Sequence, residues 1–120
     1  FSLKVKESKK KLFSIFSKIK NKKLKVIGYG ATAKSCTVLN YCKVGRNFIE
    51  YFYDTTSCKI GRYLPGSKIL IKKYKKLDKK NVDIAFLGAW NFKEEIFKKE
   101  KNFINKGGKF ITHVPIPKII

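Results

Sequence analysis

The sequence predicts an α/β fold of the Rossmann-like type, a three-layer sandwich around a mostly parallel sheet of about five strands. Strand-like apolar segments alternate with helical patterns, residues 82–90 are apolar almost throughout, and a glycine turn at 28–33 joins a strand to a helix. Alternation favours parallel strands, and a continuously apolar strand is typical of one covered on both faces. Right-handed crossovers then predict the strand order 3-2-1-4-5.

The N-terminal half is expected to hold two helices and two strands. Leu12, Phe16 and Ile19 recur at helical spacing, and residues 48–54 are rich in aromatic and β-branched types. Gly45 is expected to end the second helix. The expected elements are a helix over 8–20, a strand over 24–30, a helix over 32–44 and a strand over 48–54.

The C-terminal half begins with a loop over 55–66 that is punctuated by glycine and proline. Tyr74 and Leu77 indicate one or two turns of helix within 73–80. Gly107 is expected to end a longer helix. The remaining expected elements are a strand over 68–71, a strand over 82–90, a helix over 92–108, a strand over 109–114 and a rigid tail over 115–120.

A length of 120 residues fits one Rossmann-like domain, residues 1–120, with residues 1–24 as a helical lead-in. No apolar run approaches the roughly 18 to 20 residues of a membrane span, so we expect no membrane partner. The N-terminus lacks the pattern of a signal peptide. The chain contains no methionine, even at position 1, and we therefore expect a piece of a longer protein.

The formal net charge of +21 raises the possibility of a nucleic-acid partner. However, Arg46 and Arg62 are the only arginines among 29 basic residues, and the lysines are spread over the whole chain. Arginine is the residue that recognises bases and phosphates in bidentate geometry. We therefore interpret the lysines as solvated surface and expect no specific nucleic-acid binding.

The cysteines and the histidine do not form a recognisable metal site. Cys36, Cys42 and Cys58 are odd in number and have no C-x-x-C spacing, and His113 is the only histidine. Neither a zinc site nor a disulfide framework is expected, and a reducing cytoplasm fits this cysteine usage.

No catalytic set is recognisable either. One histidine supplies no persuasive Ser-His-Asp arrangement, and the carboxylates Glu94, Glu95 and Glu100 fall on an expected surface helix. We therefore assign no catalytic residue in this chain.

The glycine turn supports two interpretations. Gly28, Gly30 and Ala33 fit the G-x-G-x-x-G/A pattern of a dinucleotide-binding turn, and Asp54 lies near the spacing of a ribose-binding carboxylate. This pattern would permit a stand-alone module that binds NAD(P) or another nucleotide. The same turn also packs helix against strand in many such domains, and Asp54 equally fits an Asx-turn at a strand end.

Trp90 and Asn91 follow the buried fourth strand, at the edge where ligands of open α/β sheets bind. A tryptophan there could stack on a sugar or base, and an asparagine could bind hydroxyls. The alternative is a packing tryptophan followed by a helix-capping asparagine, because Glu94 stands three residues after Asn91 as in a capping box.

Four motifs in order resemble the C-terminal domain of the sugar C-methyltransferases. They are "GYGATAKSCTVLNYC", "YFYDTTSCKIGRYLPGSKILI", "VDIAFLGAWNFKEEI" and "GGKFITHVPIPKII", and the resemblance runs from about Lys25 to the end. These enzymes use S-adenosylmethionine to methylate carbon in nucleotide-linked 4-keto-deoxysugars. The resemblance implies that the cofactor and the catalytic base belong to a central methyltransferase domain of the same polypeptide, and that no cofactor binds to this part.

The resemblance also implies a role in enclosing the nucleotide-linked sugar. Asn40, Gly61, Pro65 and Gly66 match the family's motifs, whereas "ITHVP" departs from the expected proline-rich form and gives His113 no role. We expect the glycine turn to face the diphosphate. The expected substrate-binding residues are Gly28, Tyr29, Gly30, Ala31, Thr32, Lys34, Asp54, Arg62, Tyr63, Trp90 and Asn91.

Overall fold

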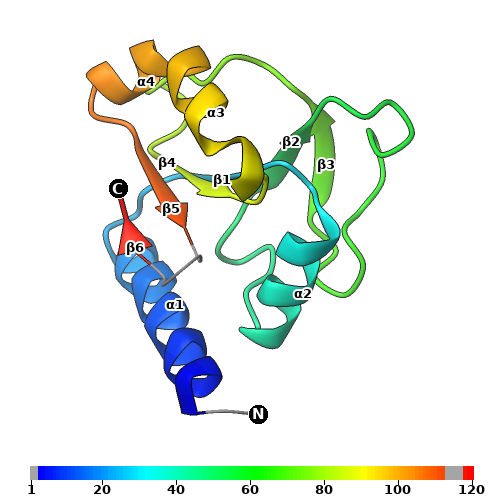
Figure 1. Cartoon of the computed structure of the whole chain (residues 1–120), viewed down its shortest axis with the longest axis vertical. Coiled ribbons are helices and arrows are strands. Elements are labelled where there is room, and N and C mark those ends of the chain that lie inside the picture. Colours follow the sequence, from blue (N-terminus) through cyan, green and yellow to red (C-terminus); the bar gives the residue numbers. More distant parts are fainter. Residues whose placement is uncertain (1–2, 113–117) are drawn as a thin grey trace.

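The computed structural model describes residues 3–112 and 118–120. Its centre is a six-stranded sheet in the order β3-β2-β1-β4-β5-β6 (Figure 1). Strands β1 to β5 are parallel to their neighbours, and β6 pairs antiparallel with β5. The expected α/β class and the order 3-2-1-4-5 are therefore confirmed. The strands are β1 (Val26–Tyr29), β2 (Tyr51–Asp54), β3 (Leu70–Lys73), β4 (Ile84–Leu87), β5 (Lys109–Thr112) and β6 (Lys118–Ile119).

Helices cover both faces of this sheet. The α1 and α2 helices pack on one face and α3 and α4 on the other, with η1 joining β4 to α3 (Figure 1). The helices are α1 (Leu3–Asn21), α2 (Ala33–Tyr41), the short 3₁₀ helix η1 (Trp90–Phe92), α3 (Lys93–Lys99) and α4 (Lys101–Asn105).

Alternating strand residues supply the two halves of the core. Phe52 and Phe86 face α1 and α2, where they meet Phe16 and Leu39. The alternate residues Ile27 and Tyr29 of β1, and Ala85 and Leu87 of β4, face α3 and α4. Both sets are buried because successive strand residues point to opposite faces. The apolar run of the fourth strand is thus explained by helices on both sides of it.

Three helix boundaries differ from the expectation. The second helix ends at Tyr41 with Lys43 in the left-handed region at φ 56°, so Gly45 does not end it. Glu100, at φ −102° and ψ 25°, divides the expected single helix over 92–108 into α3 and α4. The first helix extends over Leu3–Asn21, beyond the expected 8–20.

One segment of the C-terminal half was assigned wrongly, and another adds a strand to the expectation. Residues 73–80 form no helix: the Tyr74 N–H donates to the Asp54 carbonyl oxygen and so continues the pairing beside β2. Leu77 is nevertheless buried, as its apolar character indicated. The tail continues as an edge strand at Lys118–Ile119, while residues 113–117, including His113, lie outside the described residues.

Candidate functional site

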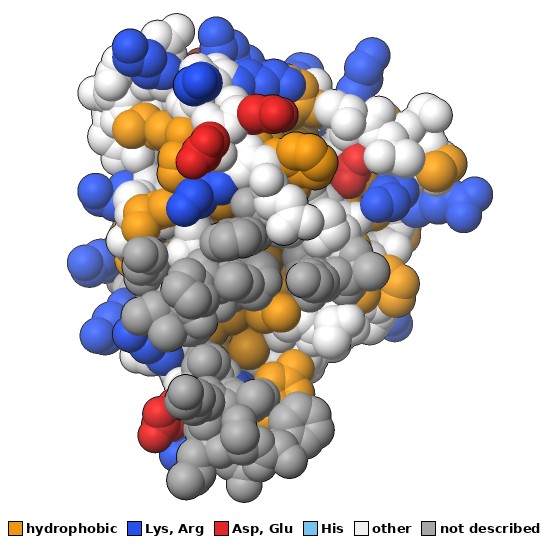
Figure 2. Space-filling model, viewed as in Figure 1, with side chains coloured by type: hydrophobic (Ala, Val, Ile, Leu, Met, Phe, Trp, Pro, Cys, Tyr) orange, Lys and Arg blue, Asp and Glu red, His pale blue; other side chains and the backbone are white. Residues whose placement is uncertain are grey.

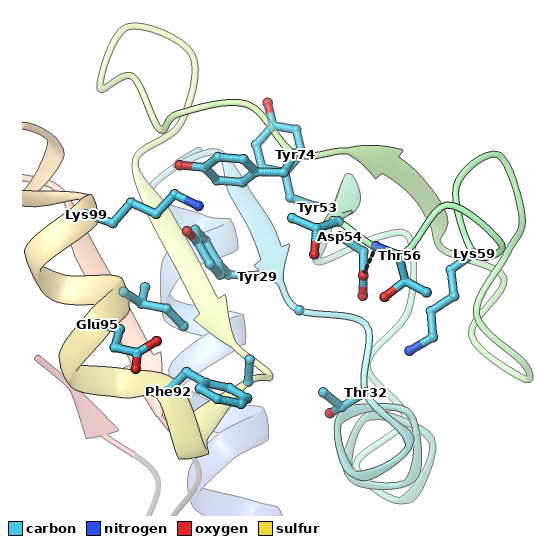
Figure 3. Close-up of a pocket in the computed structure, with 14 residues that line it drawn as sticks. Tyr29, Thr32, Tyr53, Asp54, Thr56, Lys59, Tyr74, Phe92, Glu95 and Lys99 are labelled. Atoms are coloured by element: carbon cyan, nitrogen blue, oxygen red, sulfur yellow. Dashed lines mark hydrogen bonds between the residues drawn. The ribbon is translucent and has the colours of Figure 1, made fainter.

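A cleft of about 380 Å³ opens at the carboxyl ends of β1, β2 and β4 (Figure 3). In a parallel sheet of this order, neighbouring strands β1 and β4 send their connections to opposite faces, which leaves a crevice between the connections. One wall of the cleft comes from the β1–α2 turn and the segment after β2. The other wall comes from η1 and α3, and tyrosines from β1, β2 and the segment after β3 lie between the two.

The β1–α2 turn is held by bonds from within the protein. The Gly30 N–H donates to the Tyr53 carbonyl oxygen at 2.9 Å, and the Ala31 N–H donates to Asp54 Oδ2 at 2.9 Å. The Ala31 carbonyl oxygen accepts from Lys59 Nζ at 2.9 Å. Two of the turn's N–H groups are thus already used, so a phosphate would have to bind further along, near Thr32 and the first turn of α2.

Each oxygen of the Asp54 carboxylate accepts a backbone N–H. While Oδ2 accepts from Ala31, Oδ1 accepts from the Thr56 N–H at 2.8 Å and closes an Asx-turn. Burial acts to raise the pKa of Asp54, but these donors and the nearby Lys59 ammonium outweigh it and lower the pKa below its ordinary value. Asp54 therefore serves as a structural clamp on the turn, and the Asx-turn interpretation is confirmed.

Two glycines have packing reasons that need no ligand. Gly28 pairs with Phe52 on β2, and a Cβ on Gly28 would collide with the Phe52 ring. Gly30 has φ +90° and lies so close to Ala89 that a Cβ would come within 2.7 Å of the Ala89 Cβ. Both positions therefore require glycine for the sheet to pack and the turn to form.

The floor of the cleft is aromatic. The ring centroids of Tyr29 and Tyr74 lie 5.8 Å apart in an edge-to-face arrangement, and those of Tyr53 and Tyr74 lie 6.1 Å apart. Burial raises the pKa of Tyr29 to about 12, and the negative charge of Glu100 acts in the same direction. Burial also raises the pKa of Tyr74. These hydroxyls therefore stay protonated at neutral pH.

A buried carboxylate fixes the position of Tyr74. Glu100 has no exposed surface, and its Oε1 accepts from the Tyr74 hydroxyl at 2.6 Å. The Leu77 N–H approaches both carboxylate oxygens at 3.3 Å. The expectation that Glu100 lies on a helix surface was wrong, because the helix breaks there and turns the side chain inward.

We call the wall formed by η1 and α3 the α3 wall. It carries Phe92 from η1 and, from α3, Glu95, Ile96 and Lys99 (Figure 3). Phe92 is 58% exposed although it is a large apolar side chain. Lys99 Nζ lies 4.0 Å from the centroid of the Tyr74 ring, which is cation–π geometry. Phe92 is also the N-cap residue of α3 and no side chain caps that helix, so of the two alternatives for Asn91 the helix-capping one is wrong.

Among the described residues that line the cleft, the charges balance. Asp54 and Glu95 are its carboxylates, and Lys59 and Lys99 are its cations, whereas the whole chain carries +21. The face in Figure 2 shows Lys and Arg side chains dispersed around the described surface, with carboxylates between them. The cleft is therefore not a concentrated basic patch of the kind that binds polyanions.

The structure brings together only part of the predicted set of site residues. Tyr29, Gly30, Thr32 and Asp54 line the cleft. Gly28 and Ala31 lie next to them in β1 and the turn. The backbone of Lys34 and Trp90 lies in α2 and η1, and their side chains are outside the described part. Arg62, Tyr63 and Asn91 are exposed and do not line the cleft.

Several residues that line the cleft were not predicted from the sequence. Tyr53 could have been found, because it directly precedes the predicted site residue Asp54. Glu95 was identified only as a surface carboxylate, and nothing marked Lys59 or Lys99 in a chain with 29 basic residues. Their shared position depends on the helix break and the loop path, which the local pattern does not reveal.

Comparison with known proteins gives two findings. The family model described as C-methyltransferase C-terminal domain matches residues 1–115. The chain is also 40% identical over 95 residues to the C-methyltransferase NovU of Streptomyces niveus, over 79% of this chain and 23% of that protein. The chain belongs to the C-methyltransferase C-terminal domain family. It spans about a quarter of the length of this curated relative.

The family resemblance noted in the sequence is thus confirmed, and several of its motif residues have structural roles. Asn40 Nδ2 on α2 donates to the Pro65 carbonyl oxygen at 3.0 Å, and Cys36 Sγ lies 3.2 Å from the same oxygen. The Ile71 N–H donates to the Arg62 carbonyl oxygen at 2.8 Å. The "GRYLPG" segment therefore runs along the outer edge of β3 and is tied to α2. Such a segment protects an edge strand from unwanted pairing.

Among the described residues, no group of three or more histidine, cysteine, aspartate or glutamate side chains could hold a metal ion. The described helices include none that is both long and apolar enough to span a membrane.

Proposed function

We propose that this chain is the nucleotide-sugar-binding part of an S-adenosylmethionine-dependent C-methyltransferase, and that it transfers no methyl group alone. The acceptor would be a nucleotide-linked keto-deoxysugar. The observation that carries the proposal is the charge-balanced aromatic cleft at the switch point of the sheet, in a domain of this family. Ligand sites of open α/β sheets lie at that point, and aromatic walls with a few polar groups are typical of them.

The two walls favour one orientation of the substrate. Lys59 donates one N–H to the Ala31 carbonyl oxygen. An ammonium has three N–H donors, so two remain for a ligand. Together with Thr32 and Lys34 at the start of α2, Lys59 would face the diphosphate. The sugar or base would then lie toward the aromatic floor and the α3 wall.

The cleft does not fit an adenosine cofactor of the usual kind. In Rossmann-like sites a carboxylate near the end of the second strand binds the adenosine ribose. Here both Asp54 oxygens already accept backbone N–H groups. This supports placing S-adenosylmethionine, and the catalytic base, in another domain of the same polypeptide. It also weakens the support that Asp54 gives to a stand-alone NAD(P)-binding module.

Calorimetric titration of the 120-residue chain tests this division of labour. We expect measurable binding of a nucleotide-sugar such as UDP-glucose, binding of S-adenosylmethionine no tighter than millimolar, and no methyl transfer. A micromolar dissociation constant for S-adenosylmethionine, or tight binding of NAD, would contradict the proposal.

A further inference from the structure

Glu95 differs from the other charged groups of the cleft. Asp54 accepts two backbone N–H groups, Lys59 donates to the Ala31 carbonyl oxygen, and Lys99 lies over the Tyr74 ring. For Glu95, the structure shows no hydrogen bond or ion pair with any described residue. Its side chain lies on the cleft side of α3 (Figure 3). The carboxylate is thus available to accept hydrogen bonds from a ligand.

Phe92 lies on the same wall, three residues earlier. Its ring is 58% exposed and borders the cleft beside Glu95 (Figure 3). Leaving a phenylalanine ring in water forgoes the free energy that burial would contribute. An exposed aromatic ring next to a free carboxylate offers an apolar face and a hydrogen-bond acceptor at one place.

We propose that Phe92 and Glu95 form a subsite for a sugar ring. The Phe92 ring covers an apolar face of the sugar, and the Glu95 carboxylate accepts hydrogen bonds from sugar hydroxyls. This inference rests on the proposed function, because it takes the occupant of the cleft to be a nucleotide-sugar. Next to Glu95 a phosphate would be repelled at short range, and Lys99 on the same wall already lies over the Tyr74 ring.

Two parts of a nucleotide-sugar carry this chemistry, the ribose of the nucleotide and the attached hexose. Both offer hydroxyl donors and a C–H face. A comparison of UDP with UDP-glucose separates them, since only the second carries the hexose.

The test is a titration of the ¹⁵N-labelled 120-residue chain, followed by amide chemical shifts, with UDP-glucose, UDP and pyrophosphate as probes. The variants are Glu95→Gln and Phe92→Ala, and Glu94→Gln is the matched control. Glu94 is an exposed neighbour on α3 that does not line the cleft. Because Phe92, Glu94 and Glu95 are all exposed, the variants are expected to fold, and the dispersion of the spectra checks this.

We expect UDP-glucose to shift amides of the cleft, and Glu95→Gln to weaken its binding about fivefold or more, as expected for one charge-assisted hydrogen bond in an open cleft. Phe92→Ala should also weaken it, and Glu94→Gln should leave it unchanged. Pyrophosphate binding should stay equal or become tighter in Glu95→Gln, since a negative charge is removed. A loss seen with both UDP and UDP-glucose assigns the ribose, and a loss confined to UDP-glucose assigns the hexose.

Other results overturn the subsite. If UDP-glucose shifts the cleft amides but binds Glu95→Gln as well as the wild type, the sugar subsite is wrong while the proposed function stands. Equal losses in Glu94→Gln and Glu95→Gln would also reject it, because the effect would then be one of general charge. If neither UDP-glucose nor UDP shifts a cleft amide, the proposed binding of a nucleotide-sugar by this chain fails and the subsite fails with it.

Discussion

Replacing Asp54 with alanine should destabilise the β1–α2 turn. The substitution removes the acceptor of the Ala31 N–H at 2.9 Å and of the Thr56 N–H at 2.8 Å. It also removes the anion beside Lys59, which itself holds the Ala31 carbonyl oxygen. If Asp54 is a clamp and not a ribose ligand, the loss appears in folding stability without any ligand present.

The expected size of the loss follows from where the two donors lie. Ala31 is 4% exposed, and leaving a buried N–H without a partner costs about 1 to 3 kcal/mol. Thr56 is exposed, so water can replace the carboxylate there at a cost of about 0.5 kcal/mol or less. We therefore expect Asp54→Ala to lower the free energy of unfolding by about 2 kcal/mol.

Urea denaturation followed by far-UV circular dichroism measures this difference, and Asp78→Ala is the matched control. Asp78 Oδ1 accepts the Lys80 N–H in an exposed local turn, so its loss should cost about 0.5 kcal/mol or less. The folded-state pKa of Asp54 is lowered. Its contribution is therefore complete above the unfolded-state pKa of about 3.9 and is lost as pH falls through the lower folded value. The gap between wild type and Asp54→Ala should shrink in that acidic range.

A loss no larger than that of the Asp78 control, or a gap that widens as the pH falls, would refute the clamp.

Three further predictions concern packing, the turn and the surface charge. Gly28→Ala should lower the free energy of unfolding by about 3 kcal/mol in urea denaturation, because its Cβ would meet the Phe52 ring. Gly45 has space for a Cβ and no positive φ, so Gly45→Ala should change this free energy little. Equal losses would contradict the packing of Gly28 against Phe52. Lys34→Ala should weaken nucleotide-sugar binding by the full-length enzyme by about 1 to 3 kcal/mol in calorimetry, and an unchanged affinity would show that the turn does not face the diphosphate. Nucleic-acid binding measured by fluorescence anisotropy should mostly vanish between about 50 and 200 mM salt; sequence-selective binding that survives would overturn the interpretation of the lysines as general surface.

The fold was predictable because its signals are local. Alternating segments and the apolar fourth strand determine a parallel sheet with two covered faces. Two of the failures share one long-range cause. Tyr74 and Leu77 have helical spacing, but both donate to the buried Glu100 carboxylate from an extended segment. The same carboxylate lies where the long helix breaks between α3 and α4. A local sequence pattern cannot predict these contacts of Glu100, because their partners lie 23 and 26 residues away along the chain.

The sequence predicted the position of the candidate site, but not which of its side chains are free to bind a ligand. The sequence placed the turn and Asp54 together at one edge of the sheet, and they do meet there. Spacing cannot reveal whether a carboxylate is free or already bonded, because that depends on which N–H groups the folded turn presents to it. Glu95 shows the converse case, since a residue on an expected surface helix faces the cleft once η1 and α3 have formed.

The charge distribution unites these observations. A chain of net charge +21 attracts any phosphorylated ligand over long range, which speeds encounter but gives little selectivity. Among the described residues that line the cleft, the charges cancel, so net charge adds little to the attraction of a phosphate there. Selectivity must then come from shape and from individual hydrogen bonds. A nucleotide-sugar suits this division, because its diphosphate can lie beside Lys59 and the start of α2 while its uncharged ring lies against the aromatic floor and Glu95. A simple polyanion has no ring to place against Phe92 and Glu95, and this is why Glu95→Gln should weaken the binding of UDP-glucose without weakening that of pyrophosphate.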